Sequence, residues 1–264
     1  MKFLATSLLI VIILGFSLIS LLYFGQERLI FFPSKLSKEH QFTFDLPFEE
    51  IEVSSGTEKL SSLLFTKSKS KGVLLYFHGN AGDLSGWGHV AQDFRPFPYD
   101  IWIIDYRGYG KSTGTIRSEK DLYQDAEALY QTATQRYNDK EIIIYGRSIG
   151  SGVGAYLAKK YPPKMLILET PYYNFPDLVT SIYPVLPTSI IRYTLCTNEY
   201  IAETSYPVHL FHGTQDELIP YDSAVRLERL SDNITLHTIE GAGHNNISDF
   251  PIFRERLLEL LNAR

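Results

Sequence analysis

The chain has 264 residues, of which 44% are hydrophobic and 21% charged, and its formal net charge is −5. This composition is that of an ordinary globular protein, and it excludes an intrinsically disordered chain, a collagen-like repeat and a polytopic membrane protein. Because acidic residues outnumber basic ones, nothing points to nucleic acid as the main partner. The only cysteine, Cys196, excludes an internal disulfide framework and a zinc site built from several cysteines.

The first residues of the chain differ from the rest. The 22 residues Phe3–Phe24 contain no charged side chain, and as a helix they would be about 33 Å long, enough to cross a hydrocarbon core of roughly 30 Å. We therefore predict a single-pass membrane anchor over residues 1–27, with membrane lipid as its partner. A cleaved signal peptide and a buried core helix are the alternatives. The flanking charges leave the side of the membrane open.

Residues 28–264 are expected to form one α/β domain. Segments 42–53 and 60–66 predict an antiparallel hairpin, and later apolar runs without strict alternation are typical of strands buried on both faces of a parallel sheet. These runs are Val73–Phe77, Ile101–Asp105, Ile142–Tyr145, Met165–Glu169, Val208–Phe211 and Ile234–Ile239. Helical patterns lie near 119–136, 149–160, 222–230 and 251–262. The alternation predicts a mostly parallel sheet flanked by helices.

One segment interrupts this alternation. Residues 170–207 contain five prolines among many Tyr, Ile and Leu residues. The segment is too long for a simple connection between a strand and a helix, and too apolar for an exposed loop. We predict that it is a short lid inserted into the domain.

A nucleophile is predicted at Ser148, in the sequence GRSIG at residues 146–150. It directly follows a predicted strand and opens a helix rich in small residues, which is the context of a nucleophile elbow. An ordinary helix-capping serine would not require both flanking glycines. A second match surrounds Ser112, but it begins five residues after its strand and continues into a polar stretch, so we do not assign it a role in catalysis.

A serine hydroxyl needs a general base and a group that orients the base. Of seven histidines, His244 has the most suitable setting, in the glycine-containing loop after the last predicted strand. Asp216 follows the strand Val208–Phe211 and could place its carboxylate beside His244. Its rivals are the neighbouring Glu217 and the helix-start residues Asp222 and Asp249.

The predicted oxyanion hole combines two backbone N–H groups. One belongs to Ile149, the residue after the nucleophile, and the other to Asn80 in the loop HGNAG at residues 78–82. A plain glycine-rich turn is the alternative for this loop. We expect His78 to brace the loop, and the sequence DYRGYG at residues 105–110 to brace the same sheet edge.

The motifs FHGNAG, DYRGYGKS, GRSIGSG, HGTQDELIP and GAGHNN, in this order and spacing, resemble the α/β-hydrolase superfamily. With the apolar leader, they are similar to its membrane-anchored alpha/beta hydrolase domain-containing branch of serine hydrolases. The resemblance implies an α/β-hydrolase fold with an eight-stranded sheet whose second strand is antiparallel. The order serine, aspartate, histidine along the chain is that of this superfamily.

These observations predict a serine hydrolase, of the esterase or thioesterase type, which cleaves a small-molecule or lipid-like substrate through Ser148, His244 and Asp216. We expect no metal, no cofactor and no nucleic acid partner. A peptidase that uses the same three residues is the main alternative, and a non-catalytic scaffold is a weaker one, because such proteins commonly lose one of the three.

Overall fold

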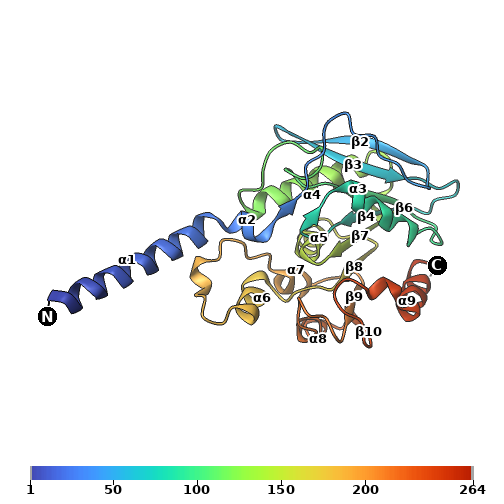
Figure 1. Cartoon of the computed structure of the whole chain (residues 1–264). Coiled ribbons are helices and arrows are strands. Elements are labelled where there is room, and N and C mark those ends of the chain that lie inside the picture. Colours follow the sequence, from blue (N-terminus) through green and yellow to red (C-terminus); the bar gives the residue numbers. More distant parts are fainter. Residues whose placement is uncertain (1, 263–264) are drawn as a thin grey trace.

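A single twisted sheet forms the centre of the molecule (Figure 1). This computed structural model describes residues 2–262, apart from the side chains of residues 2, 4, 5, 8 and 11. The sheet has eight strands in the order β10-β9-β8-β7-β4-β6-β3-β2. Their bounds are β2 (Phe48–Ser55), β3 (Glu58–Phe65), β4 (Val73–Phe77), β6 (Asp100–Ile104), β7 (Ile142–Arg147), β8 (Met165–Glu169), β9 (Val208–Gly213) and β10 (Ile234–Ile239).

Strand β3 is antiparallel to both of its neighbours, β2 and β6, whereas the other pairs in this sheet are parallel. The expected α/β-hydrolase arrangement is therefore confirmed. The predicted first strand is too long at its start, since β2 begins at Phe48. Phe42 and Phe44 pack in the hydrophobic core on one face of the sheet, with ring centroids 6.2 Å apart, and do not extend the strand.

Helices cover both faces of the sheet, as the strand–helix alternation predicts. On one face, apolar side chains of α4 (Glu119–Ala133), α5 (Ile149–Lys160) and α8 (Asp222–Glu228) share a core with β4, β7 and β8. On the other face, α3 (Leu84–Trp87) and α9 (Pro251–Asn262) pack against the same strands. Short 3-10 helices η1 (Gly88–Gln92), η2 (Asp139–Glu141) and η4 (Ile247–Asp249) occupy the connections.

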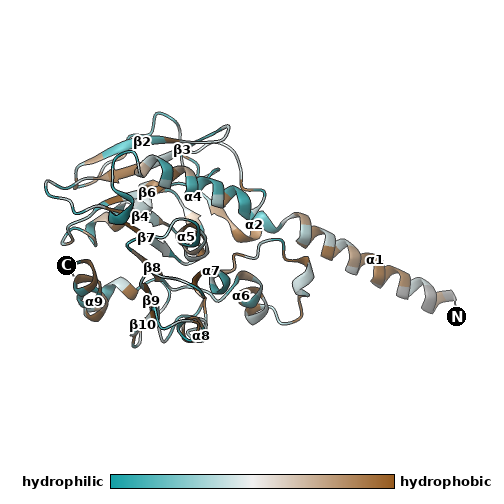
Figure 2. Cartoon of the chain, turned by 180° about the vertical axis from the view of Figure 1, so that it is seen from behind, coloured by the Kyte–Doolittle hydropathy of each residue, from teal (hydrophilic) through white to brown (hydrophobic). Residues whose placement is uncertain are grey.

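The chain begins with helix α1 (Lys2–Phe24), which leads away from the body, followed by the short helix α2 (Gln26–Ile30) and strand β1 (Phe32–Pro33) (Figure 1). Hydrophobic residues line much of α1 in Figure 2. The predicted membrane-spanning anchor at residues 1–27 is nevertheless not supported: over residues 2–262, no helix reaches the combination of length and apolar character that crossing a bilayer requires. The prediction of membrane lipid as a partner rested on the same helix, so it is not supported either.

The segment predicted as a lid lies between β8 and β9. It contains α6 (Phe175–Ile182), the 3-10 helix η3 (Thr188–Ile190) and α7 (Thr197–Ile201). Figures 1 and 2 both show the loop after α6, which contains η3, beside the C-terminal end of α1 and beside α2. The middle of this segment therefore meets the N-terminal residues.

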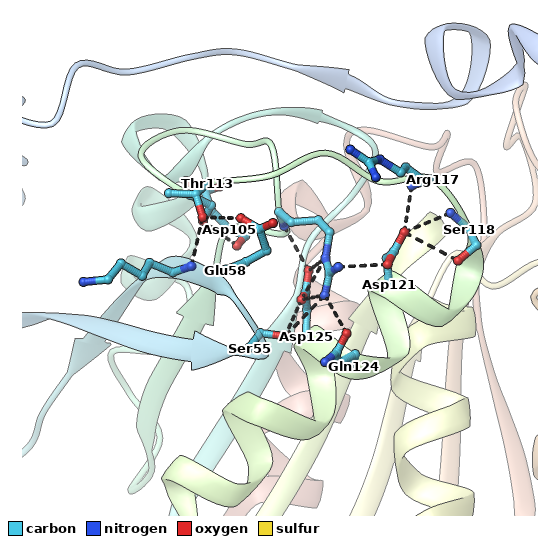
Figure 3. Close-up of polar contacts among 12 residues, drawn as sticks. Ser55, Glu58, Asp105, Thr113, Arg117, Ser118, Asp121, Gln124 and Asp125 are labelled. Carbon is cyan, nitrogen blue, oxygen red and sulfur yellow. Dashed lines mark hydrogen bonds and ion pairs between the residues drawn. The ribbon is translucent and has the colours of Figure 1, made fainter.

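A buried polar network joins the end of β2 to α4 and to the loop after β6. Asp125 is completely buried, and it accepts hydrogen bonds from Ser55 (2.7 Å) and from the backbone N–H of Arg107 (3.0 Å). The Arg107 guanidinium also forms an ion pair with Asp125, and donates to Asp121 (2.8 Å) and Gln124 (3.2 Å). Figure 3 shows Asp125 between Ser55 and Gln124. The loop that the sequence predicted to brace the sheet edge is thus itself fixed by a buried charge pair.

Two histidines on the adjacent strands β9 and β10 are expected to make stability depend on pH. His209 on β9 and His237 on β10 face each other with ring nitrogens 3.2 Å apart. Burial, together with the charge of His237, lowers the pKa of His209 from 6.5 to about 4, and burial also lowers the pKa of His237. Between these pH values the unfolded chain binds more protons than the folded one, so stability falls as the pH drops from 6.5 towards 4.

We expect the free energy of unfolding, measured in urea, to fall by on the order of 1–2 kcal/mol between about pH 7 and pH 4.5 through this pair, after allowance for its partial exposure. In His209→Gln this fall should be clearly smaller. An unchanged pH dependence in that variant would contradict the assignment.

Candidate active site

Ser148 occupies a sharp turn between β7 and α5. Its φ angle is 53°, in the left-handed region that a side chain other than glycine rarely adopts. The two flanking glycines permit this turn: a Cβ at Gly146 would collide with the carbonyl of Gly150, and one at Gly150 with the carbonyl of Phe77. The strand–turn–helix context predicted from the sequence is present, and it holds the Ser148 side chain above the carboxyl edge of the sheet.

His244 and Asp216 come from neighbouring loops and meet Ser148. His244 Nε2 lies 3.1 Å from Ser148 Oγ, and His244 Nδ1 lies 2.8 Å from Asp216 Oδ2. Because the carboxylate accepts the proton on Nδ1, Nε2 carries the free lone pair that faces the serine hydroxyl. The three residues form one hydrogen-bonded chain, although 96 and 28 residues separate the partners in sequence.

The Asp216 carboxylate is held on both oxygens. Oδ1 accepts hydrogen bonds from the backbone N–H groups of Leu218 (2.9 Å) and Ile219 (2.8 Å), and Oδ2 faces His244 and His212. Burial alone would raise the pKa of Asp216, but the hydrogen bonds from His212 and His244 outweigh it and hold this pKa well below its ordinary value. The carboxylate is therefore charged at neutral pH.

His212 is a member of the site to which the sequence analysis gave no role. It is completely buried, and its Nε2 lies 3.2 Å from Asp216 Oδ2 and 3.0 Å from the carbonyl oxygen of Ile219. The spacing of four residues between His212 and Asp216 was the available signal, but outside a helix such a spacing does not imply contact. His212 helps to fix the carboxylate that holds His244.

The rival candidates make other contacts. Glu217 accepts the backbone N–H of His244, at 3.3 Å. Asp222 is the first residue of α8, and Asp249 is the last residue of η4. The hydroxyl of Ser112 is buried and links the carbonyl of Asp105 to the N–H of Ser61, at 2.9 Å each. This second serine motif therefore has a structural role.

The loop that carries Asn80 is fixed from two sides. The Asn80 carbonyl accepts hydrogen bonds from Tyr109 Oη and from the N–H of Phe32, both at 2.8 Å. Its side-chain amide donates to the carbonyl of Ile30 at 3.0 Å. His78, which the sequence predicted to brace this loop, is buried with its Nδ1 2.7 Å from the carbonyl of Gly79. The backbone around Asn80 is thereby held at the wall of the site.

A cavity of about 780 Å³ opens beside these residues, and both predicted oxyanion-hole residues, Asn80 and Ile149, line it together with Ser148 and His244. The remaining lining is almost wholly apolar, and it comes from the N-terminal residues, from the segment 170–207 and from Leu218 and Ile219. A volume of this size accommodates a small-molecule ligand. Within the described residues, no group of three or more His, Cys, Asp and Glu side chains is arranged to hold a metal ion.

The chain is similar to a known protein family and to several curated proteins. Residues 68–198 match the family described as serine aminopeptidase, S33. The chain is 33% identical over 205 residues to alpha/beta hydrolase domain-containing protein 17C of Mus musculus, covering 73% of this chain and 60% of that protein. It is 32% identical over 203 residues to protein 17B of Homo sapiens, covering 73% and 67%. The chain thus spans about 60% of the length of the 17C proteins.

Solved structures share the fold at lower sequence identity. The esterase Pf2001 of Pyrococcus furiosus superposes with a TM-score of 0.70 at 18% identity, covering 89% of this chain and 98% of that one. Est1E of Butyrivibrio proteoclasticus with bound ferulic acid gives a TM-score of 0.65 at 19% identity, covering 79% and 98%. At this level of identity the likeness concerns the fold.

Proposed function

This chain belongs to the α/β-hydrolase superfamily, and from that premise we propose that it is a serine hydrolase that cleaves a carboxylic ester or thioester with an apolar acyl group. One observation carries the proposal: the hydrogen-bonded chain of Asp216, His244 and Ser148 lies at the wall of an apolar cavity. In this proposal residues 28–264 are the catalytic domain, and residues 170–207 are its lid.

In the first half-reaction, Ser148 Oγ attacks the substrate carbonyl carbon while His244 Nε2 takes the hydroxyl proton. Asp216 holds Nδ1–H and stabilises the imidazolium that forms. The N–H groups of Asn80 and Ile149 donate to the oxyanion of the tetrahedral intermediate. Ile149 is the first residue of α5, where N–H groups have no partner within the helix and the helix dipole favours negative charge.

The intermediate then collapses. His244 gives its proton to the departing alcohol or thiol, and the acyl group stays on Ser148 as an ester. In the second half-reaction, His244 removes a proton from water, which attacks the acyl carbonyl. Collapse of the second intermediate releases the carboxylic acid, and Ser148 regains its proton from His244.

The walls of the cavity favour an apolar acyl group. Side chains such as Leu178, Val179 and Leu186 line it, and none of its lining residues is charged apart from any charge His244 gains during the reaction. An alkyl chain that leaves water for such a cavity gains roughly 0.8 kcal/mol for each methylene buried.

Peptide cleavage is the second candidate, because the family profile that matches residues 68–198 is described as a serine aminopeptidase. An aminopeptidase must bind the charged α-ammonium group of its substrate, which requires a carboxylate or similar acceptor near the scissile bond. The residues that line the cavity include no Asp or Glu. This lack of a counter-charge favours the ester or thioester over the peptide.

The proposal is tested by labelling the purified protein with a fluorophosphonate and locating the adduct by peptide mass spectrometry. We expect one adduct, on Ser148, because within residues 2–262 this is the serine that has both an activating base and the proposed oxyanion donors. Ser112→Ala should label like the wild type, which makes it the matched control. Labelling that persists in Ser148→Ala would overturn the assignment of the nucleophile.

The same protein separates the candidate activities. We expect hydrolysis of p-nitrophenyl acyl esters and of an acyl thioester, and no release of p-nitroaniline from amino-acid p-nitroanilides. The reverse result would favour the peptidase. Absence of both labelling and hydrolysis in folded protein would favour a non-catalytic scaffold.

A further inference from the structure

The cavity beside Ser148 has two walls that come from distant parts of the chain. One wall is formed by residues 22–32, which we name the N-terminal strap, and the other by residues 172–191 of the segment between β8 and β9. From the strap, the cavity is lined by Leu22, Gln26, Leu29, Ile30 and Phe32. The strap contributes no strand to the central sheet.

The Gln26 side chain bridges the two walls. The Gln26 amide donates from Nε2 to the carbonyl of Ile190 (2.7 Å) and to the carbonyl of Tyr23 (3.1 Å), while its Oε1 accepts the backbone N–H of Arg192 (2.9 Å). It pairs with residues 190 and 192 as the backbone of a neighbouring strand would. These contacts join positions more than 160 residues apart.

Neighbouring contacts fix the same junction. Glu27 forms an ion pair with Arg192 (3.0 Å) and accepts a hydrogen bond from Tyr193 Oη (3.0 Å). The rings of Phe31 and Tyr193 meet edge to face with centroids 5.4 Å apart. These contacts anchor the strap at residues 190–193, at one end of the second wall. Tyr183 and Val185, earlier in the same wall, are exposed.

Gln26 is a polar side chain in a cavity wall that is otherwise apolar. Gln26 is only 9% exposed, and burial of an amide in an apolar wall is unfavourable unless its polar atoms are paired. A leucine or methionine would line the cavity at no such cost. A carboxamide can donate to a carbonyl and accept from an N–H with one planar, uncharged group, and asparagine is one methylene shorter. The position is therefore specified by the pairing with residues 190 and 192.

We propose that Gln26 is a positioning residue that sets the separation of the two cavity walls, and so makes the N-terminal strap a determinant of acyl-chain specificity. The inference rests on the proposed function, since it concerns the cavity that receives the acyl group. With the walls held together, each added methylene of a linear acyl chain is buried, and kcat/KM should rise by about fourfold per methylene until the cavity is filled. If the Gln26 hydrogen bonds are lost and the walls separate, water enters the cavity and the rise in kcat/KM per methylene is lost.

The test compares the full-length wild type with Gln26→Leu, which keeps an apolar side chain of similar size but cannot make the three hydrogen bonds. We expect kcat/KM for p-nitrophenyl decanoate to fall at least tenfold, through KM, and that for p-nitrophenyl acetate to change less than twofold. Gln131→Leu, an exposed substitution on α4, is the matched control and should leave both values unchanged.

Gln26→Glu provides a readout that a merely structural role would not move. In its carboxylate form, the substituted side chain would oppose the carbonyls of Ile190 and Tyr23. In its protonated form, it could donate to one of these carbonyls and still accept the N–H of Arg192. The decanoate-to-acetate ratio of this variant should therefore rise as the pH is lowered from about 8 to 5, whereas the wild-type ratio should stay constant. The acetate reaction, measured at each pH, corrects for the pH dependence of the catalytic steps themselves.

Failure of this inference is distinguishable from failure of the proposed function. If Ser148 is not labelled by a fluorophosphonate in the wild type, the proposed function itself is wrong. If Ser148 is labelled and acetate is hydrolysed, but Gln26→Leu and Gln26→Glu keep the wild-type chain-length ratio at every pH, the positioning role is wrong.

Should Gln26→Leu fail to fold, Leu29→Trp tests the same wall, because Leu29 is exposed over 61% of its surface and lines the cavity. It should lower the decanoate rate alone, while Leu258→Trp on α9 should not.

Discussion

Replacement of His244 with alanine is expected to lower kcat for ester hydrolysis by about 10⁶-fold, the loss typical of serine hydrolases without their general base. His244 is the side chain whose Nε2 lies within hydrogen-bonding distance of Ser148 Oγ, at 3.1 Å. Without it, the hydroxyl proton has no acceptor, and the leaving group has no proton donor. Steady-state kinetics with p-nitrophenyl butyrate measure the effect, and circular dichroism verifies the fold.

Two further variants show whether the three residues act as a unit. Asp216→Asn should lower kcat by about 10³–10⁴-fold, since the amide can place its N–H towards Nδ1 and favour the wrong tautomer of His244. The double variant His244→Ala/Ser148→Ala should be no slower than either single variant, because once one member is lost the other contributes nothing. If the losses in kcat of the two single variants multiplied in the double variant, the three residues would not act as a unit. His209→Gln, on β9, should keep the wild-type kcat.

Replacement of Asp125 with alanine is expected to destabilise the protein by about 3–5 kcal/mol, the typical cost of leaving a buried charge without its partner. Asp125 is completely buried, and the Arg107 side chain that it neutralises is only 9% exposed. Its loss would also leave Ser55 Oγ and the Arg107 backbone N–H without their acceptor. For a chain of this length, we expect the midpoint of thermal unfolding to fall by on the order of 10 °C.

The matched control is Asp121→Asn, which removes the other carboxylate that contacts Arg107. Asp121 is 22% exposed and shares a helix-capping interaction with Ser118, so its loss should cost only about 1 kcal/mol. Replacing both members of the buried pair, as in Arg107→Leu/Asp125→Leu, should cost less than Asp125→Ala, because no unpaired charge remains. A double variant less stable than Asp125→Ala would contradict the account.

Most of the sheet could be predicted from the sequence because its signals are local. The apolar runs Val73–Phe77, Met165–Glu169 and Ile234–Ile239 coincide with β4, β8 and β10. Their composition indicates burial in a sheet without reference to distant residues. The failure at residues 42–47 has the same origin: a local pattern reports that Phe42 and Phe44 are buried, but not whether a neighbouring strand pairs with their backbone.

The N-terminal residues mark the limit of such reasoning. An uncharged run predicted a helix, and α1 is helical from Lys2 to Phe24. The membrane span inferred from the same run is not supported. Nothing in the sequence indicated that Gln26 faces residues 190 and 192, because an isolated glutamine after an apolar helix carries no information about a contact more than 160 residues away.

By itself, the sequence determined the chemistry available at the sheet edge. A serine between two glycines after a strand, and an aspartate and a histidine in loops after later strands, follow from local backbone sterics and from the rule that parallel strands end at one edge. Only the tertiary structure decided which of these groups touch. The 3.1 Å and 2.8 Å contacts of His244, the second histidine at Asp216 and the strap that closes the cavity all depend on packing between distant segments. Such contacts are set by the shape of the whole core, which no short stretch of sequence encodes.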